Sequence, residues 1–467
     1  MDYKQYVEKI INRSRTAQKH IENYGQEKID ELCAAIAFTC TRLTFMQRAS
    51  EILVGESGMG VVENKVGKIT NKVKGVYRDM KGKKSVGCID VNEATGMWTY
   101  AKPMGVIAGI MPVTNGEATP ICKALFAIKS RNSIILAPHP KAKETNDYVA
   151  ATIRDVLKRY NAPQDLIIPI EGDYVNLGTY GELMKQADFI LATGSSALVK
   201  AAYSSGTPAI GVGTGNVVSI IDGTTDLNKV ADMIIISKSF DHATSCSTEN
   251  SLIVLESCYE DFIKAMEKKG VHLIKNDTPH KEMMIKTLWP NSPGDNVLNR
   301  RIIAQSAEKI AEIAQVPVPQ GTRVILIEED GGYDRNYPLT GEKLSPVACI
   351  RKCKTFEEGL EMMEKILEYQ GLGHSCGIHS SLDDRIHALA NRIKVCKVCV
   401  NAPQSLTNSG SWTSGFPMSL TLGCGTWGGN SISHNATWRD LLNFTYLSKP
   451  IPSTMPTDEE LFDGKEY

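Results

Sequence analysis

Cys246 is the residue of this sequence that is best placed to act as a nucleophile. Four of its neighbours within two residues carry hydroxyl groups, and an apolar run over residues 252–255 follows directly. That run predicts a buried strand. A thiol on a polar turn just before a buried strand is held firmly and stays accessible, and a nucleophile needs both. A half-buried structural cysteine would have the same surroundings, so position alone leaves both interpretations open.

The composition is typical of a globular protein. The 467 residues predict two or three domains, with 42% hydrophobic and 22% charged residues. A net charge of -1 gives no field that would attract nucleic acid or an anionic membrane. The N-terminus has no signal-type apolar segment, and no apolar run approaches the about 20 residues needed to cross a bilayer, so we expect a cytoplasmic protein.

The other cysteines do not suggest a metal site. The twelve cysteines are scattered without regular spacing, which favours reduced thiols. Cys396 and Cys399 form a lone C-x-x-C pair in an apolar stretch, with no second pair to complete four ligands. We therefore predict no metal ligands.

Strands and helices alternate from residue 106 onward. Apolar runs predict strands at 106–111, 133–137, 166–170 and 189–192, and helical periodicity lies between them, at 121–128 and 146–160, and again at 199–203. This order predicts an α/β fold with a parallel sheet covered on both faces. Ligands of such sheets bind at the carboxyl ends of the strands. The residues expected on that rim are Thr114, Asn115, His139, Pro140, Gly194 and Ser195.

The flanking regions predict further elements. Residues 3–24 and 29–53 read as two helices, and residues 86–100 read as a hairpin. The glycines at 211–215 precede a strand at 217–221 and open no helix, so they predict a tight turn rather than a nucleotide-binding loop.

The last part of the chain combines regular and irregular segments. A second α/β region extends from about 250 to 425, with helices near 259–268 and 356–367. Residues 401–429 form a long polar stretch, and loops of this length are usually functional. The proline-rich tail from residue 449 is expected to be extended or mobile.

Several ordered motifs resemble the CoA-acylating branch of the aldehyde dehydrogenase superfamily, from about residue 5 to 448. The motifs are Pro112-Val-Thr-Asn115, Ala137-Pro-His-Pro-Lys141, Ala192-Thr-Gly-Ser195, Gly211-Val-Gly-Thr-Gly-Asn216, Cys246 with Glu249, Glu342-Lys-Leu-Ser-Pro346, Gly373-His-Ser375 and Leu420-Thr-Leu-Gly-Cys-Gly-Thr-Trp-Gly-Gly-Asn-Ser-Ile-Ser433.

The resemblance implies a domain organisation. It implies a Rossmann-type cofactor domain over residues 1–240, with an oligomerisation hairpin near 85–103, and an α/β catalytic domain over residues 241–425. Residues 426–467 would return to the cofactor domain and add a strand to the hairpin near 442–448. A homodimer or homotetramer is expected.

The resemblance also implies roles for individual residues. Cys246 would be the nucleophile, the Asn115 amide would stabilise the oxyanion together with the backbone N–H of Cys246, and His374 would lie near them. Glu342 would hold the nicotinamide ribose. The residues that would line the dinucleotide are Thr114, His139, Pro140, Gly194, Ser195 and Gly213.

The implied reaction converts an aldehyde to a thioester on the cysteine, reduces NAD or NADP, and passes the acyl group to coenzyme A. Hydrolytic relatives carry a glutamate where this chain has Gly211, and glycine has no side chain to activate water. A hydrolytic dehydrogenase, a reductase acting on acyl phosphates and a catalytically silent protein remain as alternatives.

The turn before Cys246 indicates which aldehyde is the substrate. Most acylating relatives have two apolar residues just before the cysteine, whereas this chain has Thr244 and Ser245. This variant resembles the sulfoacetaldehyde dehydrogenases, and a donor-rich pocket suits a sulfonate. Succinate semialdehyde would be served similarly, and acetaldehyde or propanal remain alternatives. A sulfonate pocket usually needs a cation, and the sequence alone does not indicate which residue supplies it.

Overall fold

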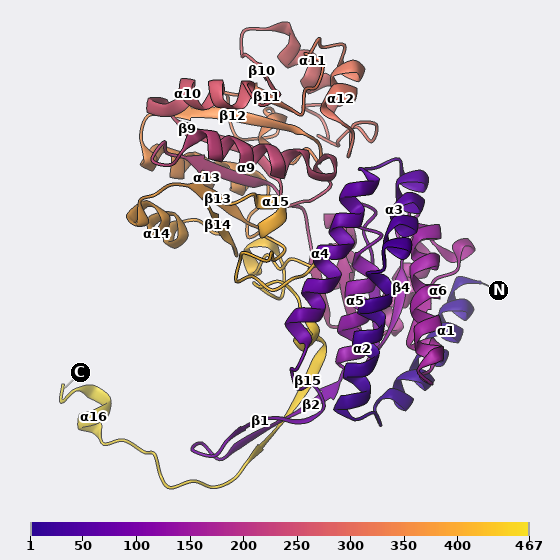
Figure 1. The fold of residues 1–467 in the computed structure, drawn as a ribbon. Coiled ribbons are helices and arrows are strands. Elements are labelled where there is room, and N and C mark those ends of the chain that lie inside the picture. The colour runs from indigo at the N-terminus through magenta and orange to yellow at the C-terminus, as the bar shows by residue number, and fades with distance from the viewer. Residues whose placement is uncertain (1, 466–467) are drawn as a thin grey trace.

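The computed structural model describes residues 2–465, which form three β-sheets with helices packed around two of them (Figure 1). The two larger sheets are entirely parallel, with five and seven strands, and the third has three antiparallel strands. The α/β fold that the sequence predicts is therefore confirmed.

The five-stranded sheet has the order β5-β4-β3-β6-β7. Its strands are β3 (Val106–Ile110), β4 (Ser133–Ala137), β5 (Ile167–Pro169), β6 (Phe189–Thr193) and β7 (Ala209–Val212). The helices of this region are α1 (Tyr3–Ile21), α2 (Gln26–Cys40), α3 (Leu43–Ser57), α4 (Val62–Met80), α5 (Thr119–Lys129), α6 (Lys143–Arg159), α7 (Leu177–Gln186) and α8 (Ser196–Tyr203). Every residue of β3 and β4 is buried, as expected for central strands covered on both faces.

The prediction of one continuous helix over residues 29–53 is wrong, because the structure has α2 and α3 there. The hydroxyl of Thr41 donates to the carbonyl oxygen of Ala37 at 2.8 Å as α2 ends. Arg42 then adopts an extended conformation before α3 begins. The apolar pattern continues across the break, so it concealed the interruption.

Helix α4 was not predicted, and its composition explains why. Three of its residues that face the protein interior are lysines, Lys65, Lys68 and Lys72, which are 0%, 6% and 8% exposed. Buried lysines break the apolar periodicity that identifies an amphipathic helix in a sequence. Helix α7 was also missed.

The seven-stranded sheet has the order β10-β11-β12-β9-β8-β13-β14. Its strands are β8 (Val217–Ile221), β9 (Glu249–Leu255), β10 (Val271–Ile274), β11 (Val324–Glu328), β12 (Val347–Cys353), β13 (Cys376–His379) and β14 (Val398–Val400). The helices are α9 (Leu227–Ser239), α10 (Glu256–Glu267), α11 (Pro279–Leu288), α12 (Ala307–Ala314), α13 (Phe356–Tyr369), α14 (Asp383–Arg392) and α15 (Gln404–Thr407). The domain division near residue 240 stays a prediction. Sheet pairing places β8 with the strands that follow it.

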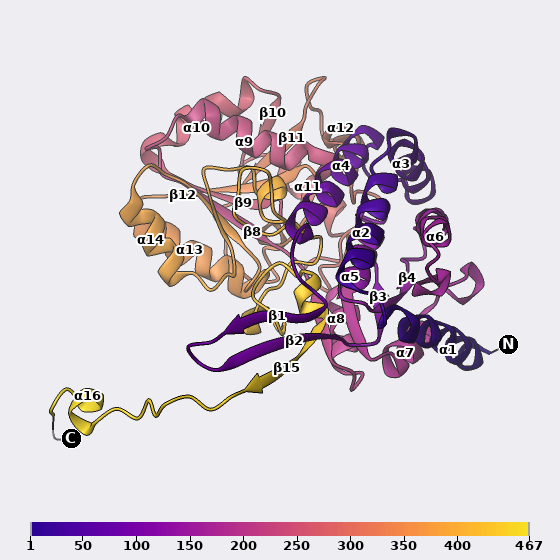
Figure 2. The same cartoon turned by 60° about the horizontal axis from the view of Figure 1, so that its bottom comes forward.

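The third sheet forms an arm that projects from the rest of the molecule (Figures 1 and 2). It consists of β1 (Gly87–Asn92), β2 (Met97–Pro103) and β15 (Leu442–Ser448), with β2 in the centre. The predicted hairpin and its pairing with residues 442–448 are confirmed. Residues 449–465, beyond β15, are exposed and extended apart from one short helix, α16 (Asp458–Phe462).

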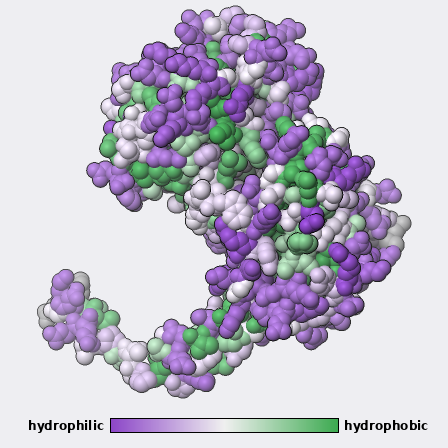
Figure 3. Space-filling view, in the orientation of Figure 1, coloured by the Kyte–Doolittle hydropathy of each residue, from purple (hydrophilic) through white to green (hydrophobic). Residues whose placement is uncertain are grey.

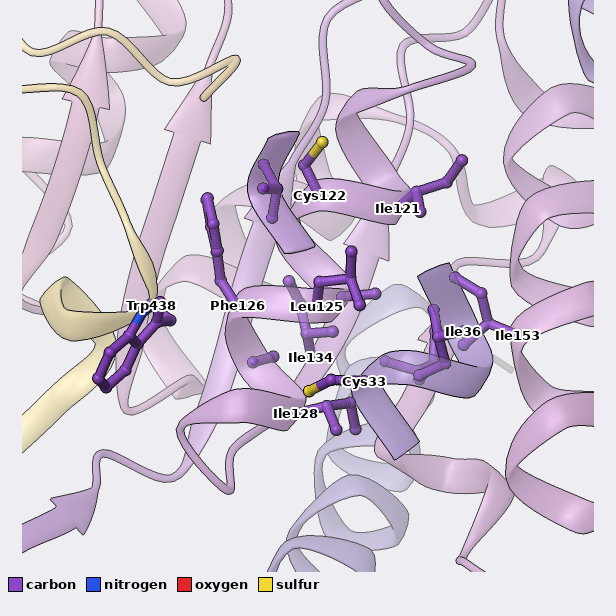
Figure 4. Packing of buried hydrophobic residues seen from close by; sticks show 14 of the residues in the cluster. Cys33, Ile36, Ile121, Cys122, Leu125, Phe126, Ile128, Ile134, Ile153 and Trp438 are labelled. Atoms are coloured by element: carbon purple, nitrogen blue, oxygen red, sulfur yellow. The ribbon is translucent and has the colours of Figure 1, made fainter. Parts of the chain in front are cut away.

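The main hydrophobic core of the first region lies between helices and sheet. Figure 4 shows Ile36 of α2, Leu125 of α5 and Ile153 of α6 on one side of the cluster near Ile134 of β4, whereas Trp438 lies at its other side, beyond Phe126. A second core fills the space around the seven-stranded sheet. On the face shown in Figure 3, hydrophilic residues cover most of the surface, and hydrophobic residues are also visible on the arm. Among residues 2–465, no helix has the length and apolar character required to span a membrane.

Candidate active site

The turn that carries Cys246 has an unusual backbone. Asp241, His242 and Ala243 have φ values of 49°, 51° and 60°, so three consecutive residues other than glycine adopt the left-handed conformation. Such residues persist only where surrounding contacts fix them. Asp241 supplies two of those contacts, because its carboxylate accepts the N–H of Val61 at 2.8 Å and its own N–H donates to Asn64 Oδ1 at 2.8 Å.

Two buried lysines of α4 form ion pairs with Asp241. Its Oδ2 lies 3.0 Å from Lys65 Nζ and 2.7 Å from Lys68 Nζ. Burial alone would raise the pKa of Asp241, but the two ammonium groups outweigh that effect and lower the pKa to about 2. The carboxylate is therefore charged at neutral pH, and the turn is tied to α4 by buried ion pairs.

The Cys246 thiol and the His374 imidazole face each other. The distance from Cys246 Sγ to His374 Nε2 is 3.4 Å, and His374 Nδ1 lies 2.7 Å from the hydroxyl of Ser375. Burial raises the pKa of Cys246 to about 12, and the nearby Glu342 carboxylate adds to this. Burial also lowers the pKa of His374 to about 3, with Lys397 acting in the same direction. The pair therefore rests as a neutral thiol beside a neutral imidazole.

Asn115 lies at the turn after β3, where its amide is held by a lysine. Its Oδ1 accepts a hydrogen bond from Lys68 Nζ at 2.6 Å, and its Nδ2 lies 3.4 Å from Thr114 Oγ1. Lys68 Nζ also lies 3.3 Å from Thr244 Oγ1, two residues before Cys246. One ammonium group thus contacts both Asn115 and the cysteine turn.

The residues predicted to line a dinucleotide lie at one edge of the five-stranded sheet. Thr114, His139 and Gly194 each follow a strand, and those strands, β3, β4 and β6, are parallel neighbours. Pro140 and Ser195 come next in the chain. Ser195 is the N-cap of α8, and its hydroxyl accepts the N–H of Leu198 at 3.4 Å. The helix therefore begins at this edge, with its positive dipole end available to an anion.

Gly213 and Gly215 connect this edge to the cysteine turn. Ser196 Oγ at the start of α8 lies 2.5 Å from Thr214 Oγ1. A Cβ on Gly215 would lie 2.0 Å from the carbonyl oxygen of Cys246. Only glycine permits this close approach, so the segment after β7 packs directly against the cysteine turn.

Glu342 is buried and has an unsatisfied oxygen. Its Oε1 has no hydrogen-bond partner among residues 2–465. Burial raises the pKa of this carboxyl to about 8. A buried polar atom without a partner carries a desolvation penalty that a ligand can remove. A ribose hydroxyl would supply the missing hydrogen bond, so the residues present fit the predicted dinucleotide.

The long polar segment over residues 401–429 is anchored beneath the cysteine turn. Glu249 begins β9, and its carboxylate accepts the Ser237 hydroxyl at 2.6 Å and the N–H of Gln404 at 3.3 Å. Lys72 of α4 holds the same segment from another side, since its Nζ donates to the carbonyl oxygen of Gly410 at 2.6 Å. These anchors were not predicted, because only the fold shows which segments the buried charges join.

The structure therefore brings Cys246 and His374 into contact and connects Asn115 to the same turn. Sequence reasoning missed the lysines of α4. It also missed Lys397, which is 3% exposed and donates to the carbonyl oxygen of Gly423 at 2.8 Å. The lysines of α4 share one helix face at positions 65, 68 and 72, but a sequence alone does not separate a buried face of this kind from a solvated one.

Comparisons with known proteins identify the family of this chain. The sequence profile of the aldehyde dehydrogenase family matches residues 4–324. A sulfoacetaldehyde dehydrogenase of an Acholeplasma species is 41% identical over 97% of this chain and 92% of its own length. A sulfoacetaldehyde dehydrogenase (acylating) of Bilophila wadsworthia is 39% identical over 98% of this chain and 97% of its own.

A solved structure is also similar to this chain. The crystal structure of an acetylating aldehyde dehydrogenase from Geobacillus thermoglucosidasius is 34% identical, has a TM-score of 0.91 and covers 98% of both chains. The profile match covers well over half of the chain, and the relatives extend over nearly all of it. The resemblance read from the motifs is confirmed: this chain belongs to the aldehyde dehydrogenase family.

Proposed function

We propose that the chain is a CoA-acylating aldehyde dehydrogenase that oxidises an aldehyde through a thioester on Cys246, reduces NAD(P)⁺ and transfers the acyl group to coenzyme A. The observation that carries the proposal is the contact of 3.4 Å between the Cys246 thiol and the His374 imidazole on a turn fixed by buried ion pairs. The acylating relatives give independent support.

The first half-reaction forms the thioester. The sulfur of Cys246 bonds to the aldehyde carbon while the thiol proton moves to His374 Nε2, which burial keeps neutral. The amide N–H of Asn115 and the backbone N–H of Cys246 stabilise the resulting alkoxide. A bound nicotinamide supplies the hydride acceptor. The C–H bond breaks as the carbonyl re-forms, which leaves an acyl thioester on the sulfur.

The second half-reaction transfers the acyl group to the thiol of coenzyme A. His374 first releases to solvent the proton that it took from Cys246. The incoming sulfur then attacks the thioester carbon, its proton goes to His374, and the Cys246–carbon bond breaks. His374 then returns the proton to the departing cysteine sulfur. The net reaction converts aldehyde, coenzyme A and NAD(P)⁺ into acyl-CoA, NAD(P)H and a proton.

Gly211 supports coenzyme A rather than water as the acceptor. A Cβ at this position of β7 would lie 2.7 Å from Val199 and 3.1 Å from Tyr203. The hydroxyl of Tyr203 also accepts the Gly211 N–H at 2.9 Å. The position has no room for the catalytic glutamate of the hydrolytic relatives, so the proposal excludes their water-activating step.

The dinucleotide would lie along the edge formed by Thr114, His139, Pro140, Gly194 and Ser195, with Gly213 beside them and its nicotinamide ribose at Glu342. NADP is proposed to be used at least comparably to NAD. Lys141 is exposed at the turn between β4 and α6, where an adenosine 2′-phosphate would approach, and position 142 is an alanine.

For the aldehyde, we propose sulfoacetaldehyde, with succinate semialdehyde as the alternative. Lys72 of α4, whose Nζ donates to Gly410 of the long polar segment, is the residue proposed to supply the cation that the sequence did not reveal. Asp241 and Glu117 are the carboxylates in contact with Lys65 and Lys68. Burial lowers the pKa of Lys72 to about 7, so a nearby sulfonate would favour its charged form.

The test is a CoA-dependent absorbance assay of NAD(P)H. Sulfoacetaldehyde is expected to give the highest kcat/KM among sulfoacetaldehyde, succinate semialdehyde, acetaldehyde and propanal, and Cys246→Ala should abolish the signal. Lys72→Met should raise KM for sulfoacetaldehyde about tenfold and leave KM for propanal within about twofold. A CoA-independent rate would refute the acylating reaction, and a preference for propanal would refute the anionic substrate.

The arm is proposed to join copies of the chain into a dimer or tetramer. Strands β1 and β15 are edge strands of its sheet, and edge strands readily pair with another chain. Light scattering of the intact protein should give a mass of two or four chains.

A further inference from the structure

The oxyanion site poses a problem that the catalytic residues alone do not solve. A side-chain amide can rotate by half a turn and exchange its oxygen for its nitrogen at little steric expense. With the oxygen toward the substrate, Asn115 would repel the developing alkoxide rather than stabilise it. Some neighbouring group has to determine which end of the amide faces the substrate.

Lys68 is positioned to make that choice. Its Nζ lies 2.6 Å from Asn115 Oδ1, and an ammonium group can donate hydrogen bonds but cannot accept them. The amide oxygen is therefore the end that faces the lysine. The amide nitrogen is left on the other side, 3.4 Å from Thr114 Oγ1, a long contact that leaves N–H groups available to a substrate.

Lys68 is itself held in place from the cysteine turn. Its Nζ donates to Asp241 Oδ2 at 2.7 Å and to Thr244 Oγ1 at 3.3 Å, and Glu117 Oε1 lies 3.6 Å away. The side chain is 6% exposed, so water screens these contacts little. One ammonium group thus fixes Asn115 relative to the segment that presents the backbone N–H of Cys246.

We propose that Lys68 is a positioning residue: it orients the Asn115 amide and connects it to the cysteine turn, so that the two oxyanion donors keep a fixed separation. This inference rests on the proposed acyl transfer at Cys246. The proposal gives a function to Lys68, on a helix whose importance the sequence did not reveal. Lys68 would contribute to stabilisation of the transition state rather than to binding of the aldehyde.

The test combines two variants in a double-mutant cycle. Lys68→Met removes the ammonium group and keeps most of the side-chain length. It should lower kcat by about 10-fold to 100-fold, because loss of an oxyanion donor costs about 10²–10³ in rate and a misoriented amide retains part of its effect. KM for the aldehyde should change by less than about threefold. When Asn115 is already alanine, Lys68→Met should lower kcat by less than about threefold, since no amide remains to be oriented.

Lys65→Met is the matched control. Lys65 lies one turn earlier on α4 and binds the same Asp241 oxygen at 3.0 Å, but it makes no hydrogen bond to Asn115. Its effect on kcat should be the same, within about twofold, whether residue 115 is asparagine or alanine. Equal losses for Lys68→Met in the two backgrounds would show that it acts only through the ion pair, and would overturn the proposal.

A variant of Asn115, the partner of Lys68, tests the proposal if Lys68→Met does not fold. Asn115→Asp keeps an acceptor for Lys68 but removes the amide donor. Its thermal unfolding temperature should be at least that of Asn115→Ala, and its kcat should be equally low. A lower unfolding temperature would mean that the carboxylate meets Asp241 and Glu117 rather than Lys68, and would refute the proposed orientation.

A structural readout separates this inference from the proposed function. If the wild-type protein oxidises no aldehyde in the presence of coenzyme A, the proposed function fails, and neutron crystal structures, which distinguish the amide oxygen from the nitrogen, still decide the orientation. The Asn115 amide oxygen should contact Lys68 in the wild-type protein and lose a fixed partner in Lys68→Met. An unchanged amide in the variant would overturn the inference, whatever the enzyme's activity.

Discussion

The ionisation of Cys246 before substrate binds can be tested by its rate of alkylation as a function of pH. Many reactive cysteines are thiolates at neutral pH because a neighbouring cation lowers their pKa. Here burial and the Glu342 carboxylate raise the pKa of Cys246 to about 12, and Lys397 opposes this only in part. At pH 8 the thiolate fraction is then about 10⁻⁴, because pH 8 lies about four units below that pKa.

Inactivation by iodoacetamide should therefore accelerate about tenfold for each pH unit between pH 7 and pH 10, since only the thiolate reacts. No inflection is expected between pH 5 and pH 8, because the pKa of His374 is lowered to about 3 and the imidazole stays neutral across that interval. The assay follows alkylation of Cys246 in the cofactor-free enzyme by mass spectrometry at intervals after iodoacetamide is added, so that variants of low activity can be compared.

Two variants sharpen the measurement. His374→Ala should change the alkylation rate by less than about tenfold, because a neutral imidazole stabilises a thiolate only weakly. Glu342→Gln should increase the rate above about pH 8, where the Glu342 carboxyl, with its pKa of about 8, is charged and opposes ionisation of the thiol. A plateau above pH 7, lost in His374→Ala, would show a thiolate–imidazolium pair and would refute this reasoning.

Three further predictions concern other parts of the site. Asn115→Ala should lower kcat by about 10² or more at nearly constant KM, as measured by steady-state kinetics, because the proposed oxyanion loses a donor. Gly215→Ala should reduce kcat by more than about 100-fold, because its Cβ would lie 2.0 Å from the Cys246 carbonyl oxygen, whereas Gly181→Ala in α7, with nothing within 4 Å, should retain full activity. Glu56→Gln should raise kcat/KM for NADP relative to that for NAD. The Glu56 carboxylate accepts the backbone N–H groups at the start of α6, beside the proposed 2′-phosphate position, and its charge would repel that phosphate. An unchanged ratio of the two kcat/KM values would place the phosphate elsewhere.

The parallel strands and their rim could be predicted from the sequence because they depend on local patterns. Apolar runs identified β3, β4 and β6, and the rule that parallel strands bind ligands at their carboxyl ends placed Thr114, His139 and Gly194 together. These inferences need no knowledge of distant contacts, since each strand is recognisable from a few consecutive residues.

The ionic part of the site could not be predicted in the same way. Lys68 and Asp241 are 173 residues apart in the chain, and neither is distinctive in its local sequence. The buried lysines even concealed α4, because they occupy positions where an amphipathic helix carries apolar side chains. Pairing of buried charges depends on which segments the fold brings together, and a single sequence does not contain that information in local form.

The strained turn and the buried ion pairs are best understood together. A left-handed conformation costs about 1–3 kcal/mol for each residue other than glycine, and Asp241, His242 and Ala243 adopt it in succession. Buried ion pairs add little net stability, but removing one partner is strongly destabilising because it leaves an unpaired charge. The turn can leave this conformation only if Asp241 leaves Lys65 and Lys68, so the ion pairs penalise relaxation of the turn rather than stabilise the fold.

The Lys68 ammonium group, which is one of the two that oppose this relaxation, also holds the Asn115 oxygen. The buried ion pair with the strained turn and the contact that orients the amide therefore meet at the Lys68 ammonium group, and the donors are arranged before the aldehyde arrives.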